Sequence, residues 1–243
     1  MIDSKKRSVS KAVIWKVLGV IILSLLVYFS TKSLGKATIL ALFYHATMLV
    51  IYFLHERIWN MISWGKTKGL FIQMTGLSGA GKTTLSRFVA DRLRVKGIQV
   101  ELIDGDEYRK NLCSDLGFSK EDRNTNIRRL GFVASVLARN RVVTVISAIN
   151  PYEEVRDELR DRYGDSKLVY VKCDLDTVIS RDPKGLYKKA TLPVGHPDRI
   201  DNFTGISDPF EEPESSDLVI DTSKEHLEES AEKLEKFILE NIE

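Results

Sequence analysis

The sequence predicts an α/β domain in which helices flank a parallel sheet, preceded by a two-helix transmembrane hairpin. Two observations lead to this expectation. Short apolar runs alternate with amphipathic stretches from about Gly69 onward, and such alternation favours a parallel sheet with helices on both faces. Before that point the chain contains two long, almost wholly apolar runs. We place the boundary near Trp64, so that residues 1–64 form the hairpin and residues 66–243 form the second domain.

The apolar runs cover residues 12–30 and 37–54, and each approaches the roughly 20 residues that a helix needs to cross the bilayer core. In the short loop between them, Ser33 and Gly35 are expected to interrupt the helix. A cleavable signal peptide would lack the second run, and an interfacial helix would have a polar face that neither run has. A buried hairpin of a soluble protein is a further alternative, but it requires a large body around it. We therefore predict two membrane spans.

Basic residues flank the two runs unequally. They precede the first run and follow the second at Lys5, Lys6, Arg7, Lys11, Arg57, Lys66 and Lys68. The loop between the runs holds only Lys32 and Lys36. By the positive-inside rule, both termini and the second domain face the cytoplasm, as in a two-span protein of the cell (inner) membrane. This segment resembles a small two-helix membrane family of unknown function, through "SVSKAVIW" at its start and "HERIW" at its end, and that resemblance implies a location without chemistry.

The composition limits the classes of function. The formal net charge of +2 on 243 residues gives no reason to expect nucleic-acid binding. Cys113 and Cys173 have neither metal-ligand spacing nor a disulfide framework, so we expect reduced thiols. The four histidines are scattered, which argues against a zinc site.

In the second domain, apolar runs bounded by turns predict strands over residues 70–75, 100–104, 142–149, 167–173 and 217–221. Apolar residues at helical spacing predict helices over residues 82–97, 120–140, 152–164 and 224–242. The polar stretch before the last strand is expected to be irregular. Ligands of such a sheet bind at the carboxyl ends of its strands.

The stretch "GLSGAGKTT" follows the first of these strands and opens the first helix. The spacing Gly76-x4-Gly81-Lys82-Thr83 satisfies the phosphate-loop pattern, and glycines let successive N–H groups point at phosphate oxygens. We expect Lys82 to reach the β- and γ-phosphates of a nucleotide and Thr83 to offer its hydroxyl to Mg²⁺. The alternative is a chance match in a glycine-containing turn. The motif in this context predicts nucleotide binding and a P-loop NTPase-type sheet.

The second strand ends in "DGDEYR", with Asp104 and Asp106 two residues apart. Alternate residues on a strand share a face, so both carboxylates are expected to point into the phosphate cleft. One could hold Mg²⁺ through water and the other could accept a proton from an attacking hydroxyl. The alternative is a solvated acidic turn.

Two further stretches are rich in basic residues. Near the start of the second helix of this domain stand Arg123, Asn126, Arg128 and Arg129, a set that suits phosphate- or sulfate-bearing substrates. Phe118 precedes them and could stack on a base or act as an ordinary anchor. Farther on, "SRDPKGLYKKA" carries Arg181, Lys184, Lys188 and Lys189, which we interpret as a mobile cationic lid. A solvated charge run would not explain the proline and glycine among these charges.

Six segments, in order, resemble the adenylylsulfate kinase family: "GLSGAGKTT", "DGDEYR", "LGFSKEDRNTNIRR", "NPYEEVRDELR", "RDPKGLYKKA" and "FTGISDPFEEPE". They span the chain from Phe71 to Thr222. The resemblance implies that ATP, with Mg²⁺, phosphorylates the 3′-hydroxyl of adenosine 5′-phosphosulfate (APS). The product, 3′-phosphoadenosine 5′-phosphosulfate (PAPS), is the activated sulfate of assimilation and sulfation. The reaction would be in-line phosphoryl transfer.

The resemblance also implies roles for single positions. The ATP-binding residues would be Gly76, Leu77, Ser78, Gly79, Ala80, Gly81, Lys82, Thr83 and Thr84. The catalytic residues would be Lys82, Asp104 and Asp106, with Thr83 and Asp104 at the metal. The residues that bind APS would be Asp106, Arg109, Phe118, Arg123, Asn126, Ile127, Ile149, Asn150, Lys184, Gly185, Leu186, Phe203 and Thr204. Among these, Phe118 and Phe203 would sandwich the adenine.

Two departures from the family bear on the acceptor. The usual Ile-Ser-Pro reads Ile149-Asn150-Pro151, so a phosphorylated serine cannot operate here. The loop over residues 191–202 is several residues longer than the family pattern, which leaves open a kinase that acts on the 3′-hydroxyl of a different nucleotide. A non-catalytic, membrane-anchored nucleotide-binding regulator is a second alternative, although the site residues are intact. This family often pairs, so a homodimer is one expected assembly, and the hairpin suggests supply of PAPS to a membrane sulfotransferase pathway.

Overall fold

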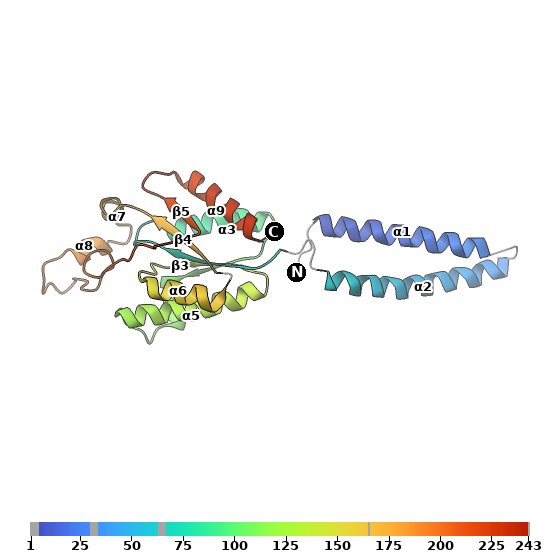
Figure 1. Cartoon of the computed structure of the whole chain (residues 1–243), viewed down its shortest axis with the longest axis horizontal. Coiled ribbons are helices and arrows are strands. Elements are labelled where there is room, and N and C mark those ends of the chain that lie inside the picture. Colours follow the sequence, from blue (N-terminus) through green and yellow to red (C-terminus); the bar gives the residue numbers. More distant parts are fainter. Residues whose placement is uncertain (1–4, 30–33, 63–66, 165, 243) are drawn as a thin grey trace. The chain divides into compact units, whose positions relative to one another are not determined.

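The computed structural model describes residues 5–29, 34–62, 67–164 and 166–242, and the chain divides into two compact units, Met1–Lys66 and Thr67–Glu243. In the first unit, α1 (Lys5–Phe29) and α2 (Leu34–Met61) lie side by side and antiparallel (Figure 1). Both helices extend beyond the predicted spans. Gly35, expected to interrupt the helix, instead lies in the first turn of α2, whereas Ser33 and Lys32 lie outside the described residues.

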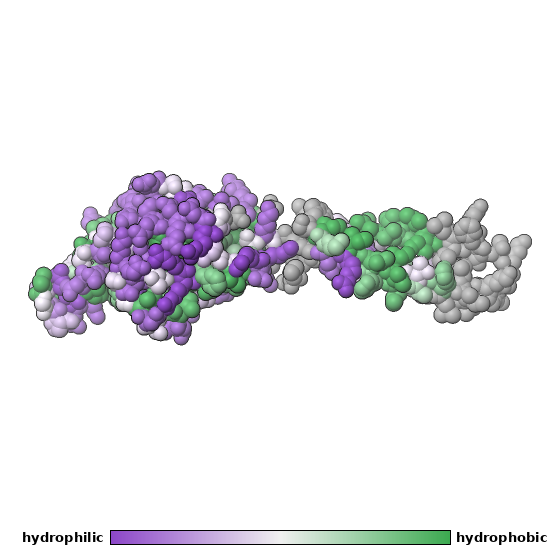
Figure 2. Space-filling view, turned by 60° about the horizontal axis from the view of Figure 1, so that its bottom comes forward, coloured by the Kyte–Doolittle hydropathy of each residue, from purple (hydrophilic) through white to green (hydrophobic). Residues whose placement is uncertain are grey.

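The described part of this helical pair presents apolar side chains at its surface. Val13 on α1 is 56% exposed and Leu49 on α2 is 75% exposed. In Figure 2, hydrophobic residues gather over the helical pair, whereas hydrophilic residues cover most of the visible face of the second unit. Within the residues that the structure describes, neither helix contains a stretch long and apolar enough to qualify as a membrane span.

The segments "SVSKAVIW" and "HERIW" meet at one end of the pair. The indole of Trp15 lies 5.8 Å from the imidazole of His55, measured between ring centroids. Trp59 Nε1 donates a hydrogen bond to His55 Nε2 at 2.9 Å, and Lys11 Nζ lies 3.4 Å from Glu56 Oε1. Side chains from both helices therefore form one small aromatic and ionic cluster.

The second unit contains one five-stranded sheet, and every pair of neighbouring strands in it is parallel, as predicted. Its order is β2-β3-β1-β4-β5, with β1 in the centre. The strands are β1 (Leu70–Thr75), β2 (Val100–Asp104), β3 (Val143–Ser147), β4 (Ser166–Lys172) and β5 (Leu218–Asp221). The carboxyl ends of β2, β3 and β1 therefore adjoin one another, at the edge where α/β sheets bind ligands.

Helices cover both faces of the sheet (Figure 1). The helices described in this unit are α3 (Lys82–Val95), α4 (Gly105–Leu112), α5 (Lys120–Arg139), α6 (Glu153–Tyr163), α7 (Leu175–Arg181), α8 (Leu186–Ala190) and α9 (Leu227–Ile242), and α3, α5, α6 and α9 pack on the sheet. Alternate side chains of the buried strand β1 pack on opposite faces of the sheet. Ile72 and Met74 pack in the core under α3 and α9, and Phe71 packs in the core under α5.

Three of these helices were not predicted. The predicted second strand ends at Asp104, and no element was predicted over residues 105–112, where Asp104 caps a helix. The stretch between β4 and β5, expected to be irregular, contains α7 and α8. Both are too short, at 7 and 5 residues, for the longer window over which helical apolar periodicity is recognised.

Leu130 tests the packing of α5 on the sheet. It is fully buried beside Phe71, Ile103 and Ile146, whereas Phe132 on the same helix is 60% exposed. We expect Leu130→Ala to lower the free energy of unfolding by about 2–5 kcal/mol, because it removes buried methyl groups and leaves a cavity. Phe132→Ala, the matched control, should change it by only about 0.5 kcal/mol.

Urea denaturation of residues 67–243, followed by far-UV circular dichroism, measures both changes. Equal losses in the two variants would contradict the assigned face of α5.

Candidate active site

The phosphate-loop sequence lies between β1 and α3 and adopts a turn that requires glycine. Gly76 has φ 149°, and a Cβ atom there would lie 2.3 Å from the main-chain oxygen of Val171 on the neighbouring strand. Gly81 is the N-cap of α3 with φ 93°. The loop therefore opens directly into a helix N-terminus, where N–H groups and the helix dipole favour an anion.

Lys82 is the first residue of α3 and is buried in this loop. Its Nζ atom donates hydrogen bonds to the main-chain oxygens of Gly76 and Leu77, each at 2.8 Å. The side chain is thereby folded back over the turn that the glycines create. An ammonium in this position can interact with phosphate oxygens bound by the loop.

Four charged groups influence one another at this point. The pKa of Lys82 is lowered to about 7, mainly by burial and next by the nearby ammonium of Lys184. The carboxylates of Asp106 and Asp104 oppose this shift in pKa. The structure thus brings the three predicted catalytic residues and the lid lysine into one electrostatic cluster.

The two predicted metal ligands are in direct contact. Thr83 Oγ1 donates a hydrogen bond to Asp104 Oδ2 at 2.9 Å, and Ser147 Oγ lies 3.1 Å from the same hydroxyl. Two hydroxyls and a carboxylate form an oxygen-only set, which suits a hard cation such as Mg²⁺. Ser147, at the end of β3, was not predicted. The adjacency of β3 and β1 in the sheet is the signal that could have found it.

The prediction that Asp104 and Asp106 share one face because they alternate along a strand is wrong. Asp104 is the N-cap of α4, and its Oδ1 atom accepts hydrogen bonds from the main-chain N–H groups of Asp106 at 3.0 Å and Glu107 at 3.3 Å. The alternation of a strand therefore does not apply to Asp106. Its carboxylate instead forms an ion pair with Lys184, from the segment between α7 and α8.

Two later parts of the chain also hold the phosphate loop in place by hydrogen bonds to its main chain. The hydroxyl of Tyr187, on α8, donates a hydrogen bond to the main-chain oxygen of Ser78 at 2.9 Å, and burial raises the pKa of Tyr187. Thr222 Oγ1 donates to the oxygen of Ala80 at 2.9 Å. The sequence did not single out Tyr187 or Thr222, although Tyr187 directly follows the predicted Leu186. Gly185, the N-cap of α8, has φ 65°.

Arg123 connects the start of α5 with the segment after the lid. Its Nη1 atom donates to Thr204 Oγ1 at 3.0 Å, and its Nη2 atom donates to the main-chain oxygen of Asn202. Its Nε atom donates to the main-chain oxygen of Phe118 at 3.0 Å. The guanidinium of Arg109 lies 4.2 Å from the centroid of the Phe118 ring. Arg109, Phe118, Arg123 and Thr204 are thus neighbours, as the prediction requires.

The two phenylalanines predicted to sandwich an adenine differ in exposure. Phe118 is 61% exposed, whereas Phe203 is 6% exposed and its ring lies edge-on to that of Tyr187, with centroids 4.8 Å apart. Phe118 is therefore free to contact a ligand. Phe203 is held against the lid helix, and its stacking role stays a prediction.

Part of the predicted basic cluster faces away from this site. Arg128 Nε lies 2.7 Å from Glu158 Oε2 on α6, and Arg129 forms two hydrogen bonds to Asp115. Both guanidinium groups are therefore paired with carboxylates within the fold, whereas the sequence grouped them with Arg123 and Asn126 as a set suited to an anionic substrate. The side chain of Ile127 packs in the core with Val155 and is not exposed to a ligand.

Among the remaining predicted acceptor residues, Asn126 and Asn150 are buried and Ile149 is partly buried. Asn126 is 6% exposed, and its Oδ1 atom has no hydrogen-bond partner among the described residues. Asn150 has φ 47°, a left-handed conformation that asparagine tolerates better than most residues. Its Nδ2 atom donates to Gln73 Oε1 at 3.3 Å, so the side chain faces the core. The main-chain oxygen of Ile149 accepts a hydrogen bond from the N–H of Gly76 at 3.2 Å.

Two family models match the chain. The family described as "Adenylylsulphate kinase" matches residues 68–221, and the family described as "Predicted membrane protein (DUF2061)" matches residues 9–60. The adenylyl-sulfate kinase of Picosynechococcus sp. is 47% identical over 173 residues, which cover 71% of this chain and 95% of that protein. The adenylyl-sulfate kinase of Rippkaea orientalis is 48% identical over 169 residues, covering 70% and 91%.

A solved structure gives the same result for the fold. The Mycobacterium tuberculosis APS kinase in complex with AMPPNP and APS superposes with a TM-score of 0.65 and 36% sequence identity. The match covers 71% of this chain and 98% of that chain. Together these comparisons confirm both of the family resemblances found in the sequence.

The lowered pKa of Lys82 predicts proton uptake on nucleotide binding. Bound phosphates should raise this pKa again, so above about pH 7 the free amine must take up a proton as the nucleotide binds. Affinity for ATP should therefore fall by up to about tenfold per pH unit between pH 7 and 9, and uptake should be larger at pH 8.5 than at pH 6.

Isothermal titration calorimetry in buffers of different ionisation enthalpy measures the uptake. The control is Lys82→Arg, whose side chain stays charged at every pH tested and whose profile contains only the protonation of the nucleotide. Identical profiles for the two proteins would contradict the prediction.

Proposed function

This chain belongs to the adenylylsulphate kinase family, and we propose on that basis that it transfers the γ-phosphoryl group of ATP to the 3′-hydroxyl of APS, giving PAPS and ADP. The observation that carries the proposal is the electrostatic cluster of Lys82, Asp104, Asp106 and Lys184. Phosphoryl transfer requires cations for the transferring group and a carboxylate for the attacking hydroxyl. The cluster supplies both within one site.

In this mechanism the chain works by positioning and by charge. The phosphate loop and Lys82 hold the β- and γ-phosphates, and Lys184 neutralises charge on the transferring group. The 3′-oxygen forms a bond to the γ-phosphorus as the bond from that phosphorus to the β–γ bridging oxygen breaks. The proton of the hydroxyl passes to the carboxylate of Asp106. Thr83 and Asp104 would hold Mg²⁺, which would supply further neutralisation of the phosphates.

The acceptor would bind on the far side of this cluster from the phosphate loop. Arg109 and Arg123 provide guanidinium groups for the phosphosulfate, and the exposed ring of Phe118 offers a face for the adenine. The Oδ1 atom of Asn126 provides a buried acceptor for a hydroxyl of the ribose. These features support a nucleotide that carries an anionic group at its 5′ position.

One observation favours a second candidate acceptor. The guanidinium of Arg123 donates to the main-chain oxygen of Asn202, the last residue of the loop that is longer than the family pattern. A change in that loop would therefore directly affect Arg123, which is predicted to bind the acceptor nucleotide. A different nucleotide with a free 3′-hydroxyl is the alternative substrate that follows.

We also propose that α1 and α2 tether the enzyme to the membrane, with both termini and the kinase unit in the cytoplasm. The match of residues 9–60 to a predicted membrane protein family supports this, as do the apolar side chains on the surface of both helices. Basic residues concentrate at the two ends of the segment, as the positive-inside rule requires. Such a tether would deliver PAPS close to a membrane-bound sulfotransferase.

The reaction is tested with residues 66–243, Mg-ATP and APS, separated by anion-exchange chromatography. We expect ADP and PAPS to appear together, and we expect Asp106→Asn to lower kcat by about 10²–10⁴-fold, because the amide cannot accept the proton. If ATP binds but APS is not phosphorylated, the proposed acceptor is wrong. A panel of nucleotides with free 3′-hydroxyls would then identify the substrate.

The tether is tested by deleting residues 1–64. The intact chain should sediment with the membrane fraction and resist extraction by high salt, because burial of apolar surface in lipid is insensitive to screening. The shortened chain should remain in the supernatant with kcat and both KM values within about twofold of those of the intact enzyme in detergent, a change of less than half a kcal/mol. Salt-extractable intact chain would contradict a membrane-spanning anchor.

A further inference from the structure

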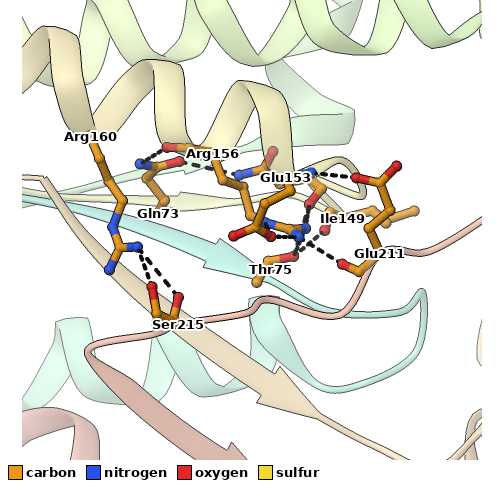
Figure 3. Close-up of polar contacts among 9 residues, drawn as sticks. Gln73, Thr75, Ile149, Glu153, Arg156, Arg160, Glu211 and Ser215 are labelled. Atoms are coloured by element: carbon orange, nitrogen blue, oxygen red, sulfur yellow. Dashed lines mark hydrogen bonds and ion pairs between the residues drawn. The ribbon is translucent and has the colours of Figure 1, made fainter.

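Arg156 lies on α6 and has no place in the mechanism described above. Its side chain is 0% exposed and is among the largest fully buried side chains of the described residues. Burying a guanidinium is costly unless each of its nitrogens is hydrogen-bonded. Here all three are, and their partners come from three different segments (Figure 3).

The first contact fixes the turn after β3. Arg156 Nη1 donates a hydrogen bond to the main-chain oxygen of Asn150 at 2.8 Å, and Thr75 Oγ1 donates to the same oxygen at 2.9 Å. The preceding carbonyl, that of Ile149, accepts from the first N–H of the phosphate loop, on Gly76. The turn Ile149–Asn150 is therefore held between Arg156 and the phosphate loop.

The second contact fixes the segment after Thr204. Arg156 Nη2 donates to the main-chain oxygen of Glu211 at 2.7 Å, and its Nε atom donates to Glu153 Oε2 at 3.0 Å. Glu211 is further held because its N–H donates to the oxygen of Pro151 at 2.9 Å. A few residues earlier in the same segment, Asp208 pairs with Thr204 in a β-bridge.

We propose that Arg156 is a positioning residue for the acceptor nucleotide, an inference that rests on the proposed function. One guanidinium joins the two walls of the acceptor site, the turn Ile149–Asn150 and the segment that contains Thr204. It touches neither substrate. Its removal should therefore misplace the acceptor while the phosphate loop, which has its own hydrogen bonds through Lys82 and Tyr187, still binds ATP.

Arginine is required for this geometry. Its planar fork presents separate N–H groups to two carbonyls from segments that are far apart in the chain. A lysine ammonium keeps the charge, but all of its N–H donors lie on one nitrogen, so it cannot reproduce the two separate nitrogens that reach the carbonyls of Asn150 and Glu211. Arg156→Lys therefore separates the charge of Arg156 from its bridging role.

Arg160 offers a matched control one turn farther along α6. Its Nη1 atom donates to Ser215 Oγ at 3.0 Å (Figure 3), and its Nη2 atom lies 3.2 Å from Asp217 Oδ2. It thus ties the same helix to a later part of the same segment, and among the described residues it has no hydrogen bond to the turn after β3. Arg160→Lys tests whether replacing any arginine on this helix by lysine would change the kinetics in the same way as Arg156→Lys.

The experiment uses the full chain in detergent and steady-state kinetics with ATP and with the nucleotide that the wild type phosphorylates. For Arg156→Lys we expect KM for the acceptor to rise at least about tenfold while KM for ATP changes by less than about twofold, because a small displacement of a binding wall has effects of this size. For Arg160→Lys we expect both KM values within about twofold of the wild type. Equal increases in both KM values of Arg156→Lys, or no change in either, would overturn the proposal.

A second variant covers the case in which Arg156→Lys does not fold. Gln73 on β1 accepts from Asn150 Nδ2 and donates to the main-chain oxygen of Arg156 at 3.3 Å, so Gln73→Met loosens the same turn without removing a charge. It should show the same selective rise in acceptor KM, smaller than that of Arg156→Lys. Failure of the wild type to phosphorylate APS would count against the proposed substrate, whereas unselective KM values in an active enzyme would count against the role of Arg156.

Discussion

The site depends on a close approach at the end of the central strand. At Gly76 the chain passes so near the backbone of β4 that no side chain fits, and its N–H group donates to the carbonyl of Ile149 after β3. This single position therefore joins three neighbouring strands where their carboxyl ends meet. The contacts at Gly76 fix the positions of the phosphate loop, the buried lysine and the turn beside the acceptor. The close packing of a parallel sheet is what makes such a junction rigid.

Side-chain contacts then connect elements that lie far apart in the chain. The lid segment is connected to α4 by the ion pair of Lys184 with Asp106, and to the phosphate loop by the hydrogen bond from Tyr187. The same two charges act with opposite sign on the pKa of Lys82. Movement of the lid would consequently alter the protonation of the residue that faces the phosphates.

Sequence reasoning predicted the parts of the site that are local in the chain. The phosphate loop follows from glycine spacing between a strand and a helix, and the sheet follows from alternating apolar runs. It failed where orientation depends on distant partners. Arg128 and Arg129 turn toward carboxylates of the fold. A local signal was also missed, since Asp104 caps a helix that includes Asp106. Arg156 gave no signal at all, since its partners Asn150 and Glu211 become neighbours only when the sheet has formed.

The aromatic cluster of Trp15, His55 and Trp59 has a practical consequence for spectroscopy. All three tryptophans of the sequence, at positions 15, 59 and 64, belong to the first unit, and the kinase unit contains none. Selectively excited indole fluorescence from the intact protein therefore originates only in the helical pair and the residues next to it. Tyrosines, in contrast, occur in both units, because Tyr28, Tyr44 and Tyr52 belong to the first. The indole signal is therefore the intrinsic fluorescence that follows the unfolding of one unit without dividing the chain.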